Sequence, residues 1–496
     1  METYDFAVIG GGPGGLAAAK EAASHGAKTV VFDYIKPSPK GTTWGLGGTC
    51  VNVGCIPKKL MHYAAILGKS EHDRVMYGFA PSVGGHDWNK LVQTVQNYIR
   101  MLNFSYRSGL LSSGVHYINA FASVTPDKRI TYEKDGKVEE IIAKNILIAV
   151  GERPYIPEDV EGAQDCAVTS DDLFKLKKSP GKTLVIGGSY VALECAGFLT
   201  GLGHDVTVSV RSILLRGFDR QCAEKVGDLM EATGTKFLYK VLPKAMKKLS
   251  TGQIEVIFTD GSVDTFDTVL YGVGRVPLDN VEEYKKIGVQ FQNGHIVAPN
   301  EDTGVPGVYA VGDILDGRPA LAPVAIKAGE LLARRIFLGA TEQMNYDNIP
   351  VCVYTPFEYS SCGLTEEKAV ELYGDASLDV FLKEFTSLEL SASHREKAEN
   401  ARKDEYDVDL PPTCLVKLIC LKDTGRILGA HFVGPNAGEI MQTLAVCIRL
   451  GATKKDFDET ISIHPTDAES FMGLSVTRAS GVSWVASGGC GGGRCG

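Results

Sequence analysis

Two stretches of the chain repeat one pattern of apolar and polar positions. Each has a short apolar run, a glycine-rich turn, an alanine-rich helical segment and a second apolar run, at residues 6–33 and 182–211. A buried apolar run that is followed by a glycine turn and a helix is typical of strand–turn–helix units in parallel sheets. Each stretch is therefore predicted to form a βαβ unit of a doubly wound nucleotide-binding domain.

Further apolar runs extend this architecture. Residues 138–151 end in an apolar run, predicted to be a strand, that is closed by Gly151. Residues 305–313 show a similar apolar run that ends in glycine and aspartate, and a helical stretch follows at 321–340. A nucleotide domain that is interrupted by a second one and then resumed is the simplest interpretation. From about residue 346 the pattern changes to strands alternating with helices, at 351–354, 365–373, 413–421, 427–433 and 437–450. The predicted fold class is α/β, with two doubly wound nucleotide-binding domains and a C-terminal α+β domain.

The composition narrows the classes of function. The 496 residues carry 44% hydrophobic and 22% charged side chains and a formal net charge of −9, as in ordinary soluble globular proteins. Nucleic acids and anionic membranes attract basic surfaces, so neither is an expected partner. No apolar run approaches the roughly 20 residues that span a bilayer, and the first residues carry no targeting pattern. We therefore expect a cytoplasmic protein.

The turn of the first βαβ unit has the spacing of a dinucleotide site. Gly10, Gly12 and Gly15 form the G-x-G-x-x-G pattern, which permits a tight turn, close approach of a pyrophosphate and close packing of helix on strand. The following helix presents its free N–H groups to the phosphates. Asp33 ends the next strand, where a carboxylate suits a ribose diol. A glycine turn without a ligand is the alternative, but the strand before it and the helix after it favour a nucleotide.

The second unit varies this pattern in a way that favours NADPH. Gly187 is followed by Ser189 at the middle glycine position and by Ala192 at the third. Its second strand ends in Arg211 rather than in an acidic residue, with Arg216 five residues later. A carboxylate would repel the 2′-phosphate of NADPH, whereas guanidinium groups bind it through paired hydrogen bonds. Two dinucleotide sites imply hydride transfer to a second, tightly held cofactor, for which FAD is the economical choice.

Twelve cysteines are spread along the chain without the spacing of a disulfide-rich framework. In a reducing compartment most of them should be free and buried, and should pack as small hydrophobic residues. This prediction applies to Cys166, Cys195, Cys222, Cys352, Cys362, Cys414, Cys420 and Cys447. Two further pairs do not fit it.

Cys50 and Cys55 form the first of these pairs and follow a glycine-rich stretch. Five residues apart on a regular α-helix, two Cα atoms lie roughly 8–9 Å apart and face different ways, whereas a disulfide normally needs less than about 7 Å. If the sulfurs are bonded, the pair must begin an irregular first turn, which Gly54 would permit. A helix N-terminus would also lower the pKa of a thiol. Zinc ligation is the alternative, although C-x4-C without a second pair is poor zinc spacing.

The segment 48–59, Gly-Thr-Cys-Val-Asn-Val-Gly-Cys-Ile-Pro-Lys-Lys, resembles the redox-active segment of the pyridine nucleotide-disulfide oxidoreductases. Within that family, residues 37–47 are similar to the high-molecular-weight thioredoxin reductases rather than to glutathione reductases. The resemblance includes the Gly-Asp pair that ends at Asp313 and the His-Pro-Thr segment that begins at His464, with Glu469 nearby. It implies FAD and NADPH as cofactors and thioredoxin as the protein substrate, with glutathione reductase as the close alternative.

The resemblance also assigns roles to individual residues. It implies that Cys55 stacks against the flavin and that Cys50 is the interchange thiol. His464, oriented by Glu469, would shuttle the proton that keeps Cys50 a thiolate, since the pKa of histidine lies near ambient pH. Further roles are a Lys58–Glu194 pair beside the flavin, Tyr190 as a flap over the nicotinamide, and FAD contacts from Thr49, Gly151 and Asp313. Family members place this histidine in the site of the partner subunit, which implies a homodimer.

The second cysteine pair lies in the last ten residues. Animal members of the family carry adjacent Cys-Cys or Cys-selenocysteine there, whereas Cys490 and Cys495 have four residues between them, similar to the tails of apicomplexan thioredoxin reductases. The glycines between them let a six-residue ring close at little steric cost, and Arg494 should lower the thiol pKa values. Such a pair would carry electrons from Cys50 and Cys55 of the other subunit to thioredoxin through mixed disulfides. A terminus with incidental cysteines is the alternative.

These patterns divide the chain into an FAD-binding domain (1–160 and 291–345), an NADPH-binding domain (161–290), an interface or dimerisation domain (346–486) and a redox tail (487–496). Residues 394–412 are densely charged and end in Pro-Pro, which predicts a solvated insertion loop, with a docking role as the alternative.

For the whole chain, the alternative of a different functional class is a flavin-bound interaction protein without turnover. The complete set of cysteine, lysine and histidine motifs counts against it.

Overall fold

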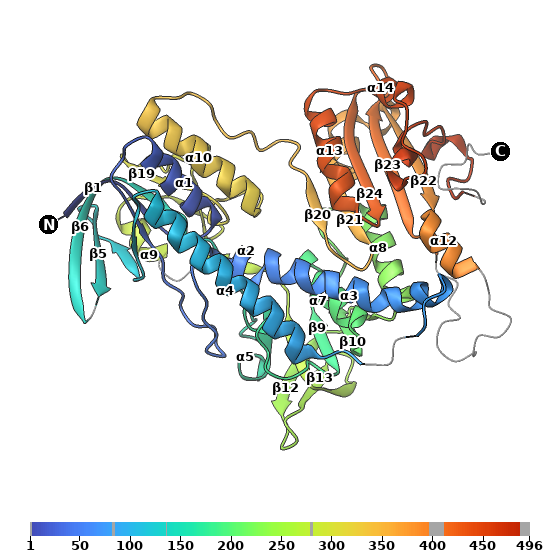
Figure 1. Cartoon of the computed structure of the whole chain (residues 1–496), viewed down its shortest axis with the longest axis horizontal. Coiled ribbons are helices and arrows are strands. Elements are labelled where there is room, and N and C mark those ends of the chain that lie inside the picture. The colour runs from blue at the N-terminus through green and yellow to red at the C-terminus, as the bar shows by residue number, and fades with distance from the viewer. Residues whose placement is uncertain (1, 82–84, 135, 278–280, 396–410, 487–496) are drawn as a thin grey trace. The chain divides into compact units, whose positions relative to one another are not determined.

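The computed structural model of the chain describes residues 2–81, 85–134, 136–277, 281–395 and 411–486 (Figure 1). The backbone forms two compact units. The first comprises Met1–Leu60, Trp88–Ser179 and Tyr271–Tyr346, and the second comprises Met61–Asp87, Pro180–Leu270 and Asp347–Gly496. Each unit unites segments that are far apart in the sequence, so its core depends on long-range contacts.

The first unit is built on a sheet of seven strands in the order β3-β2-β1-β6-β5-β4, with β19 paired to the end of β6. Strands β3, β2, β1, β6 and β19 pair in parallel, and β5 and β4 add an antiparallel extension. Their bounds are β1 (Glu2–Ile9), β2 (Thr29–Phe32), β3 (His116–Ile118), β4 (Ala122–Val124), β5 (Arg129–Lys134), β6 (Lys137–Ile148) and β19 (Val308–Ala310).

Two helices, α1 (Pro13–Ser24) and α10 (Ala322–Leu338), lie side by side on one face of this sheet (Figure 1). Alternate residues of β1 point to opposite faces, as in any strand. Phe6 and Val8 pack in the cluster with the two helices, whereas Ala7 and Ile9 join the cluster on the other face. A Cβ atom on Gly329 of α10 would lie only 2.6 Å from Gly14 O, so the two helix backbones are almost in contact.

Further helices and short strands complete the first unit. Strands β7 and β16 pair antiparallel, as do β17 and β18. The elements are α2 (Gly48–Val53), α4 (Trp88–Ser112), β7 (Glu152–Pro154), α5 (Ala163–Cys166), β8 (Val168–Thr169), α6 (Ser170–Leu173), β16 (Arg275–Pro277), α9 (Val281–Lys286), β17 (Phe291–Gln292), β18 (His295–Ile296) and the 3-10 helix η1 (Pro299–Glu301). Helix α3 (Cys55–Met76) begins in the first unit and ends in the second.

The second unit contains the second βαβ unit. Strands β11, β10, β9 and β15 are neighbours in this order, and β10 pairs in parallel with both β9 and β11. Strands β12, β13 and β14 follow β11 in the sequence and form a separate antiparallel sheet. The elements are β9 (Thr183–Ile186), α7 (Tyr190–Gly201), β10 (Val206–Val210), α8 (Arg220–Ala232), β11 (Lys236–Tyr239), β12 (Pro243–Lys248), β13 (Ile254–Phe258), β14 (Val263–Phe266) and β15 (Thr268–Tyr271).

The C-terminal part of the second unit is an antiparallel sheet in the order β20-β21-β24-β23-β22, with α13 packed on one face (Figure 1). Its elements are β20 (Val351–Val353), β21 (Glu358–Gly363), α11 (Glu366–Tyr373), β22 (Leu378–Phe385), α12 (Leu388–Arg395), β23 (Cys414–Leu421), β24 (Ile427–Gly434), α13 (Ala437–Arg449) and α14 (Lys454–Glu459), with 3-10 helices at Asp375–Ser377, Asp467–Phe471 and Arg478–Ser480. None of the helices in the described segments has the length and apolar character that crossing a bilayer requires.

The predicted fold class is confirmed, since both βαβ units and the C-terminal α+β part are present. The strands expected at 351–354, 413–421 and 427–433 are β20, β23 and β24, within one residue at each end. The insertion predicted at 394–412 lies almost wholly outside the described residues. The pattern analysis did not identify the long helices α3 and α4 or the strands β21 and β22. Tertiary contacts stabilise these elements, and their local sequence patterns are weak.

A buried group of charges links α8 to the C-terminal sheet. The Lys417 ammonium of β23 donates to both carboxylate oxygens of Asp219, at 2.9 and 2.8 Å, and lies 2.5 Å from Glu366 Oε2. The Lys417 and Asp219 side chains are only 1% and 0% exposed. Asp219 also accepts hydrogen bonds from the amides of Cys222 and Glu366. The pKa of Asp219 lies below its usual range, because the charges of His431 and Lys417 and the hydrogen bonds from Lys417 and Cys222 outweigh the effect of burial. The Asp219 carboxylate therefore depends on this buried cation, whereas Glu366 also pairs with Arg478.

We predict that Lys417→Met destabilises the protein by about 3–5 kcal/mol, because it leaves the buried Asp219 carboxylate without its cation. Lys236→Met is the matched control: its ion pair with Asp205 is 2.7 Å long but 64% and 45% exposed, so its loss should change stability by less than about 1 kcal/mol. Urea unfolding of the two variants measures the difference. Equal shifts in the unfolding midpoint would contradict the assigned importance of the buried cation.

Candidate active site

The turn between β1 and α1 contains glycines of two kinds. A Cβ atom on Gly15 would lie 2.1 Å from Gly10 O, and one on Gly10 would lie 2.2 Å from Ala149 O, so protein packing excludes side chains at both positions. Gly12 differs, because its Cβ would meet only Gly48 Cα, at 3.9 Å, and its φ of −78° suits any residue. No neighbour in the protein therefore requires glycine at position 12, whereas a ligand that approaches the backbone there would.

Asp33 follows β2 and faces this turn. Its Oδ1 accepts the Gly11 amide hydrogen at 2.9 Å. Burial raises the pKa of Asp33 to about 6, against the lowering effect of this hydrogen bond. A buried carboxylate beside a glycine turn matches the predicted ribose site, since hydroxyl donors would stabilise its charged form.

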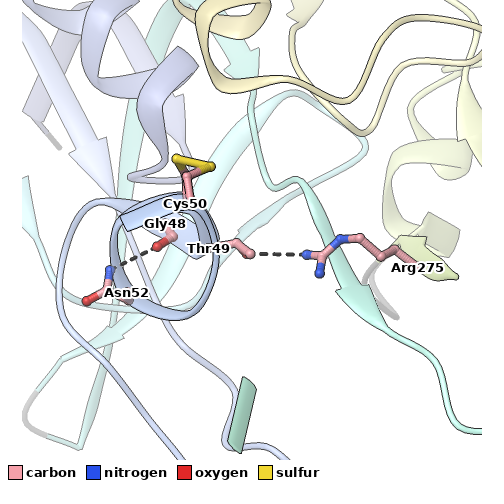
Figure 2. Close-up of a disulfide and its surroundings, with 6 residues drawn as sticks. Gly48, Thr49, Cys50, Asn52 and Arg275 are labelled. Atoms are coloured by element: carbon pink, nitrogen blue, oxygen red, sulfur yellow. Dashed lines mark hydrogen bonds between the residues drawn. A yellow bond between two sulfur atoms is a disulfide. The ribbon is translucent and has the colours of Figure 1, made fainter. Parts of the chain in front are cut away.

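Cys50 and Cys55 form a disulfide with a Cα–Cα distance of 4.7 Å (Figure 2). The predicted pairing is thus present, but the break in the helix is more complete than the irregular first turn expected. Helix α2 ends at Val53, Gly54 departs from helical geometry, and Cys55 begins α3. A Cβ atom on Gly54 would lie 3.0 Å from Thr49 O and 3.2 Å from Cys50 Cα. Since both sulfurs are bonded to each other, neither remains as a thiolate for the zinc alternative.

The start of α2 rests against the glycine turn. The Gly47 amide donates to Gly11 O at 3.0 Å, and a Cβ atom on Gly48 would lie 2.7 Å from Gly12 Cα. Gly48 also has a φ of +70°, which side chains rarely tolerate. The disulfide segment and the predicted pyrophosphate site are therefore in direct backbone contact within one unit.

Two asparagines hold α2 in this place. Asn52 is buried and donates to Gly48 O at 2.9 Å and to Gly45 O at 3.0 Å, the first of which is visible in Figure 2. Asn103 of α4 donates to Asn52 Oδ1 at 2.9 Å and to Leu46 O at 2.6 Å. The backbone on both sides of Cys50 is thus fixed by side-chain amides.

Arg275 is a site residue that the sequence analysis did not identify. Its guanidinium donates to Glu152 O at 2.6 Å and lies 3.4 Å from Thr49 Oγ1, next to Cys50 (Figure 2). The Glu152 carboxylate in turn contacts His295 Nε2 at 2.6 Å. Although burial alone would lower it, the pKa of His295 is raised, mainly by the hydrogen bond to Glu152. Burial raises the pKa of Asp313, and the charge of Arg275 opposes that effect.

The sequence gives little sign that Arg275 belongs to the site. Arg275 begins β16, which is only three residues long and pairs with β7 more than a hundred residues earlier in the chain. The structure places this cation beside Thr49 and close enough to Asp313 for its charge to oppose the rise in the pKa of Asp313 that burial causes. Gly151, predicted to contact FAD, immediately precedes β7 and has a φ of +64°. Among the predicted FAD residues, the turn glycines, Asp33, Thr49, Gly151 and Asp313 all belong to the first unit.

The second nucleotide turn belongs to the second unit. Ser189, at the middle glycine position, is the N-cap of α7 and accepts the Ala192 amide at 3.3 Å, so its hydroxyl replaces a glycine without losing helix stability. The Leu215 amide donates to Gly188 O at 2.7 Å, which brings the loop with Arg211 and Arg216 against the turn. Both arginines are exposed, and Arg216 donates to Ser212 Oγ at 2.8 Å. Tyr190 is the first residue of α7 and is 38% exposed.

Glu194 of α7 is buried and accepts the Tyr354 amide at 2.8 Å. Lys58, its predicted partner, lies in the first unit and Glu194 in the second, so that pairing stays a prediction. His464 and Glu469 do meet: His464 Nδ1 lies 3.0 and 3.1 Å from the two carboxylate oxygens. The Thr466 amide donates to Glu469 Oε1 at 3.3 Å, which fixes the carboxylate. With Nδ1–H donating to Glu469, Nε2 of a neutral ring carries the basic lone pair.

The remaining cysteines partly follow the prediction. None of these eight cysteines forms a disulfide, and five are buried, but Cys166, Cys352 and Cys447 are only half-buried. Cys447 is half-buried because it lies on α13, whose apolar stripe faces the sheet and whose other side lies in solvent. Cys490 and Cys495 lie outside the described residues.

We predict that Gly12→Ala weakens FAD binding without destabilising the apoprotein, whereas Gly15→Ala destabilises the apoprotein itself. Inserting a methyl group into a closely packed contact typically costs about 1–3 kcal/mol, so the affinity of Gly12→Ala for FAD should fall roughly 5- to 150-fold. Thermal unfolding of the apoproteins and flavin fluorescence titration separate the two effects. An apoprotein of Gly12→Ala that melts as early as Gly15→Ala would refute a ligand-imposed glycine.

We also predict that FAD affinity falls as the pH drops through about 6. Below that pH the Asp33 carboxyl is protonated in the apoprotein and must lose its proton to accept hydroxyl donors, so binding weakens by up to about tenfold per pH unit. Flavin titrations between pH 5 and 8 measure this dependence, and Asp33→Asn should flatten it. A native affinity that does not change across this range would disprove the assignment.

Comparison with known proteins agrees with this geometry. Residues 4–329 match the pyridine nucleotide-disulphide oxidoreductase family, and residues 349–474 match its dimerisation domain. Thioredoxin reductases of Plasmodium falciparum isolates FCH-5 and 3D7 are each 56% identical over 99% of this chain, covering 92% and 81% of the relatives. A thioredoxin reductase of Emiliania huxleyi is 47% identical over 98% of both chains. The resemblance inferred from residues 48–59 is thereby confirmed, and the chain belongs to the pyridine nucleotide-disulphide oxidoreductase family.

Proposed function

We propose that the chain is an NADPH-dependent flavoenzyme that reduces the disulfide of thioredoxin. The observation that carries the proposal is the Cys50–Cys55 disulfide, whose helix starts in backbone contact with the predicted dinucleotide turn through Gly48 and Gly12. A redox-active disulfide at that place can exchange electrons with a nucleotide cofactor. The relatives named thioredoxin reductase, which are similar along nearly the whole chain, support thioredoxin as the substrate.

The residues of the first unit fit FAD. The turn with Gly10, Gly12 and Gly15 would hold the pyrophosphate and Asp33 the adenosine ribose, with Thr49, Gly151 and Asp313 as further contacts. When bound, the flavin would accept a hydride from NADPH and supply two electrons to the disulfide. In the second unit, the exposed Arg211 and Arg216 would bind the 2′-phosphate of NADPH, and Tyr190 would cover the nicotinamide. Lys58 and Glu194 would pair beside the flavin.

The sulfur steps balance two electrons and two protons. Reduction breaks the Cys50–Cys55 bond and leaves Cys50 as a thiolate. That thiolate attacks the Cys490–Cys495 disulfide of the other subunit, forming a mixed disulfide and releasing one tail thiolate. Cys55 then attacks Cys50, which restores the first disulfide and leaves the tail as a dithiol. The tail repeats the exchange with thioredoxin, so the net reaction consumes NADPH and one proton and yields the thioredoxin dithiol.

His464 would manage the protons of these steps. Its ring is held by Glu469 through Nδ1, so Nε2 can take a proton from a thiol and return it to a leaving thiolate. Its side chain is 46% exposed and lies in the second unit, in the part that matches the dimerisation domain. Both facts support a homodimer in which His464 serves the disulfide of the partner subunit.

Two further proposals concern organisation and location. The division into an FAD-binding domain (1–160 and 291–345), an NADPH-binding domain (161–290), an interface domain (346–486) and a tail (487–496) places each motif in one functional part. A cytoplasmic location is supported by the eight free cysteines, since thiols persist in a reducing compartment.

We predict that removal of residues 487–496 lowers the rate of thioredoxin reduction roughly tenfold or more, because the relay between the two subunits of the dimer is lost. Flavin reduction by NADPH should be unchanged in stopped-flow measurements. Cys490→Ser should reproduce the loss, while Cys166→Ser, a free and half-buried cysteine elsewhere, should not.

Two outcomes would overturn parts of this proposal. Equal thioredoxin reduction by the truncated and full-length enzymes would exclude the tail from the relay. A full-length enzyme that prefers glutathione disulfide to thioredoxin would instead support glutathione reductase, the alternative activity in this family.

A further inference from the structure

A loop of the second unit carries the two arginines proposed to bind the 2′-phosphate of NADPH. This arginine loop, residues 211–219, connects β10 to α8. Arg211 and Arg216 are exposed, and in the described part of the chain neither forms an ion pair with a carboxylate. Leu214 and Leu215, which lie between them, are only 6% and 1% exposed. The loop therefore presents two cations to solvent from a centre that is fixed in the protein interior.

The arginine loop bends at Leu215 and lies against the second nucleotide turn. Leu215 has a φ of +46°, in the left-handed region that residues with side chains rarely adopt. Its amide donates to Gly188 O at 2.7 Å, and a Cβ atom on Gly188 would lie 2.7 Å from Ile213 O. A residue keeps such a strained conformation only where its surroundings hold it there. The contacts around Leu215 therefore decide where the loop lies.

The Arg220 guanidinium makes two of these contacts. Its Nη2 atom donates to successive carbonyls of the loop, Leu214 O at 2.7 Å and Leu215 O at 3.2 Å. The Phe218 amide donates to the same Leu215 O at 3.0 Å. Hydrogen bonds from a charged donor are stronger than those between neutral groups. Arg220 is therefore a strong tie between the start of α8 and the bend.

The backbone of Arg220 is itself held by the C-terminal part of the second unit. The Arg220 amide donates at 3.1 Å to Glu367 Oε1, on α11. Asp219, one position earlier, accepts the buried Lys417 ammonium of β23 at 2.8 Å. The guanidinium therefore extends to the loop from a fixed backbone, so the position of the bend is set by the folded protein rather than by a ligand.

We propose that Arg220 is a positioning residue that sets the preference for NADPH over NADH. This inference rests on the proposed function. Arg220 does not touch the cofactor, and instead holds Arg211 and Arg216 where they receive the 2′-phosphate. A loop that is ordered before binding spares part of the entropy that association otherwise loses. NADH has no 2′-phosphate, so its binding does not depend on Arg220.

The test uses the oxidised holoenzyme and two ligands, 2′,5′-ADP, which carries the 2′-phosphate, and ADP, which lacks it. Isothermal titration calorimetry measures the ratio of their affinities in the native protein and in Arg220→Met, and hydrogen exchange at the Leu215 amide reports release of the bend. Lys244→Met is the matched control. Lys244 is an exposed residue of β12, so its substitution removes one positive charge and leaves the contacts of the arginine loop in place.

We expect Arg220→Met to lower the preference for 2′,5′-ADP over ADP roughly tenfold, to keep the affinity for ADP and to accelerate exchange at Leu215. Lys244→Met should leave all three values unchanged. Equal losses of affinity for the two ligands would show that Arg220 supports the domain as a whole, which would overturn the inference. A preference that Arg220→Met does not change would overturn it as well.

Two further variants separate positioning from direct contact and from misfolding. In Arg211→Met/Arg216→Met the loop has no guanidinium left to position, so adding Arg220→Met should lower the remaining preference no further. A further loss would identify Arg220 as a phosphate ligand and refute the positioning role. If Arg220→Met does not fold, Gly188→Ala displaces the loop instead, because its methyl group would lie 2.7 Å from Ile213 O. It should lower the preference for 2′,5′-ADP, and an unchanged preference with faster exchange at Leu215 would refute the inference.

Failure of the proposed function gives a different result. If the chain does not use NADPH, the native protein itself binds 2′,5′-ADP and ADP with equal affinity, and none of the variants changes their ratio. A native preference for 2′,5′-ADP that survives in Arg220→Met instead refutes the positioning role alone and leaves the use of NADPH in place.

Discussion

The close approach of two glycine segments, at Gly12 and Gly48, is the constraint on which the rest of the site depends. Gly12 Cα lies too close to Gly48 for position 48 to carry a side chain, and the Gly47 amide donates to Gly11 O. Because of this contact, the N-terminus of α1 and the N-terminus of α2 lie together. One would present amides to the pyrophosphate of the proposed cofactor and the other carries Cys50, so the proposed nucleotide site and the disulfide are parts of one structure.

The same contact explains why the disulfide needs a break in the helix. With the start of α2 fixed against the glycine turn, Cys50 is held in the first turns of α2, and a continuous helix would carry Cys55 away from it. Gly54 ends α2 instead and allows Cys55 to begin α3 with the two Cα atoms 4.7 Å apart. Asn52 bonds to Gly48 and Asn103 to Leu46, while Arg275 contacts Thr49 from the other side of α2 than Asn52 (Figure 2).

The parts of this site that the sequence predicted are those whose signals are local. The glycine turns, Asp33, the C-x4-C spacing and the His464–Glu469 pair each occupy a short stretch in which spacing alone restricts the chemistry. Arg275 and Thr49 are 226 positions apart and Asp219 and Lys417 are 198 apart, so no pattern within one element could pair them. The same limit applies to the three half-buried cysteines, because residue type favours burial but the packing of the helix or strand that carries the residue decides it.

Both proposed redox pairs have the C-x4-C spacing, but the chain between their sulfurs differs in kind. Between Cys50 and Cys55 stand the end of α2, a buried asparagine and a single glycine, so the backbone fixes the sulfurs beside the nucleotide turn. Between Cys490 and Cys495 the sequence has three glycines and Arg494, and glycine restricts the backbone less than any other residue. The first pair is fixed beside the glycine turn and can therefore serve a bound cofactor, whereas the role proposed for the second pair is thiol–disulfide exchange with a protein that arrives from solution.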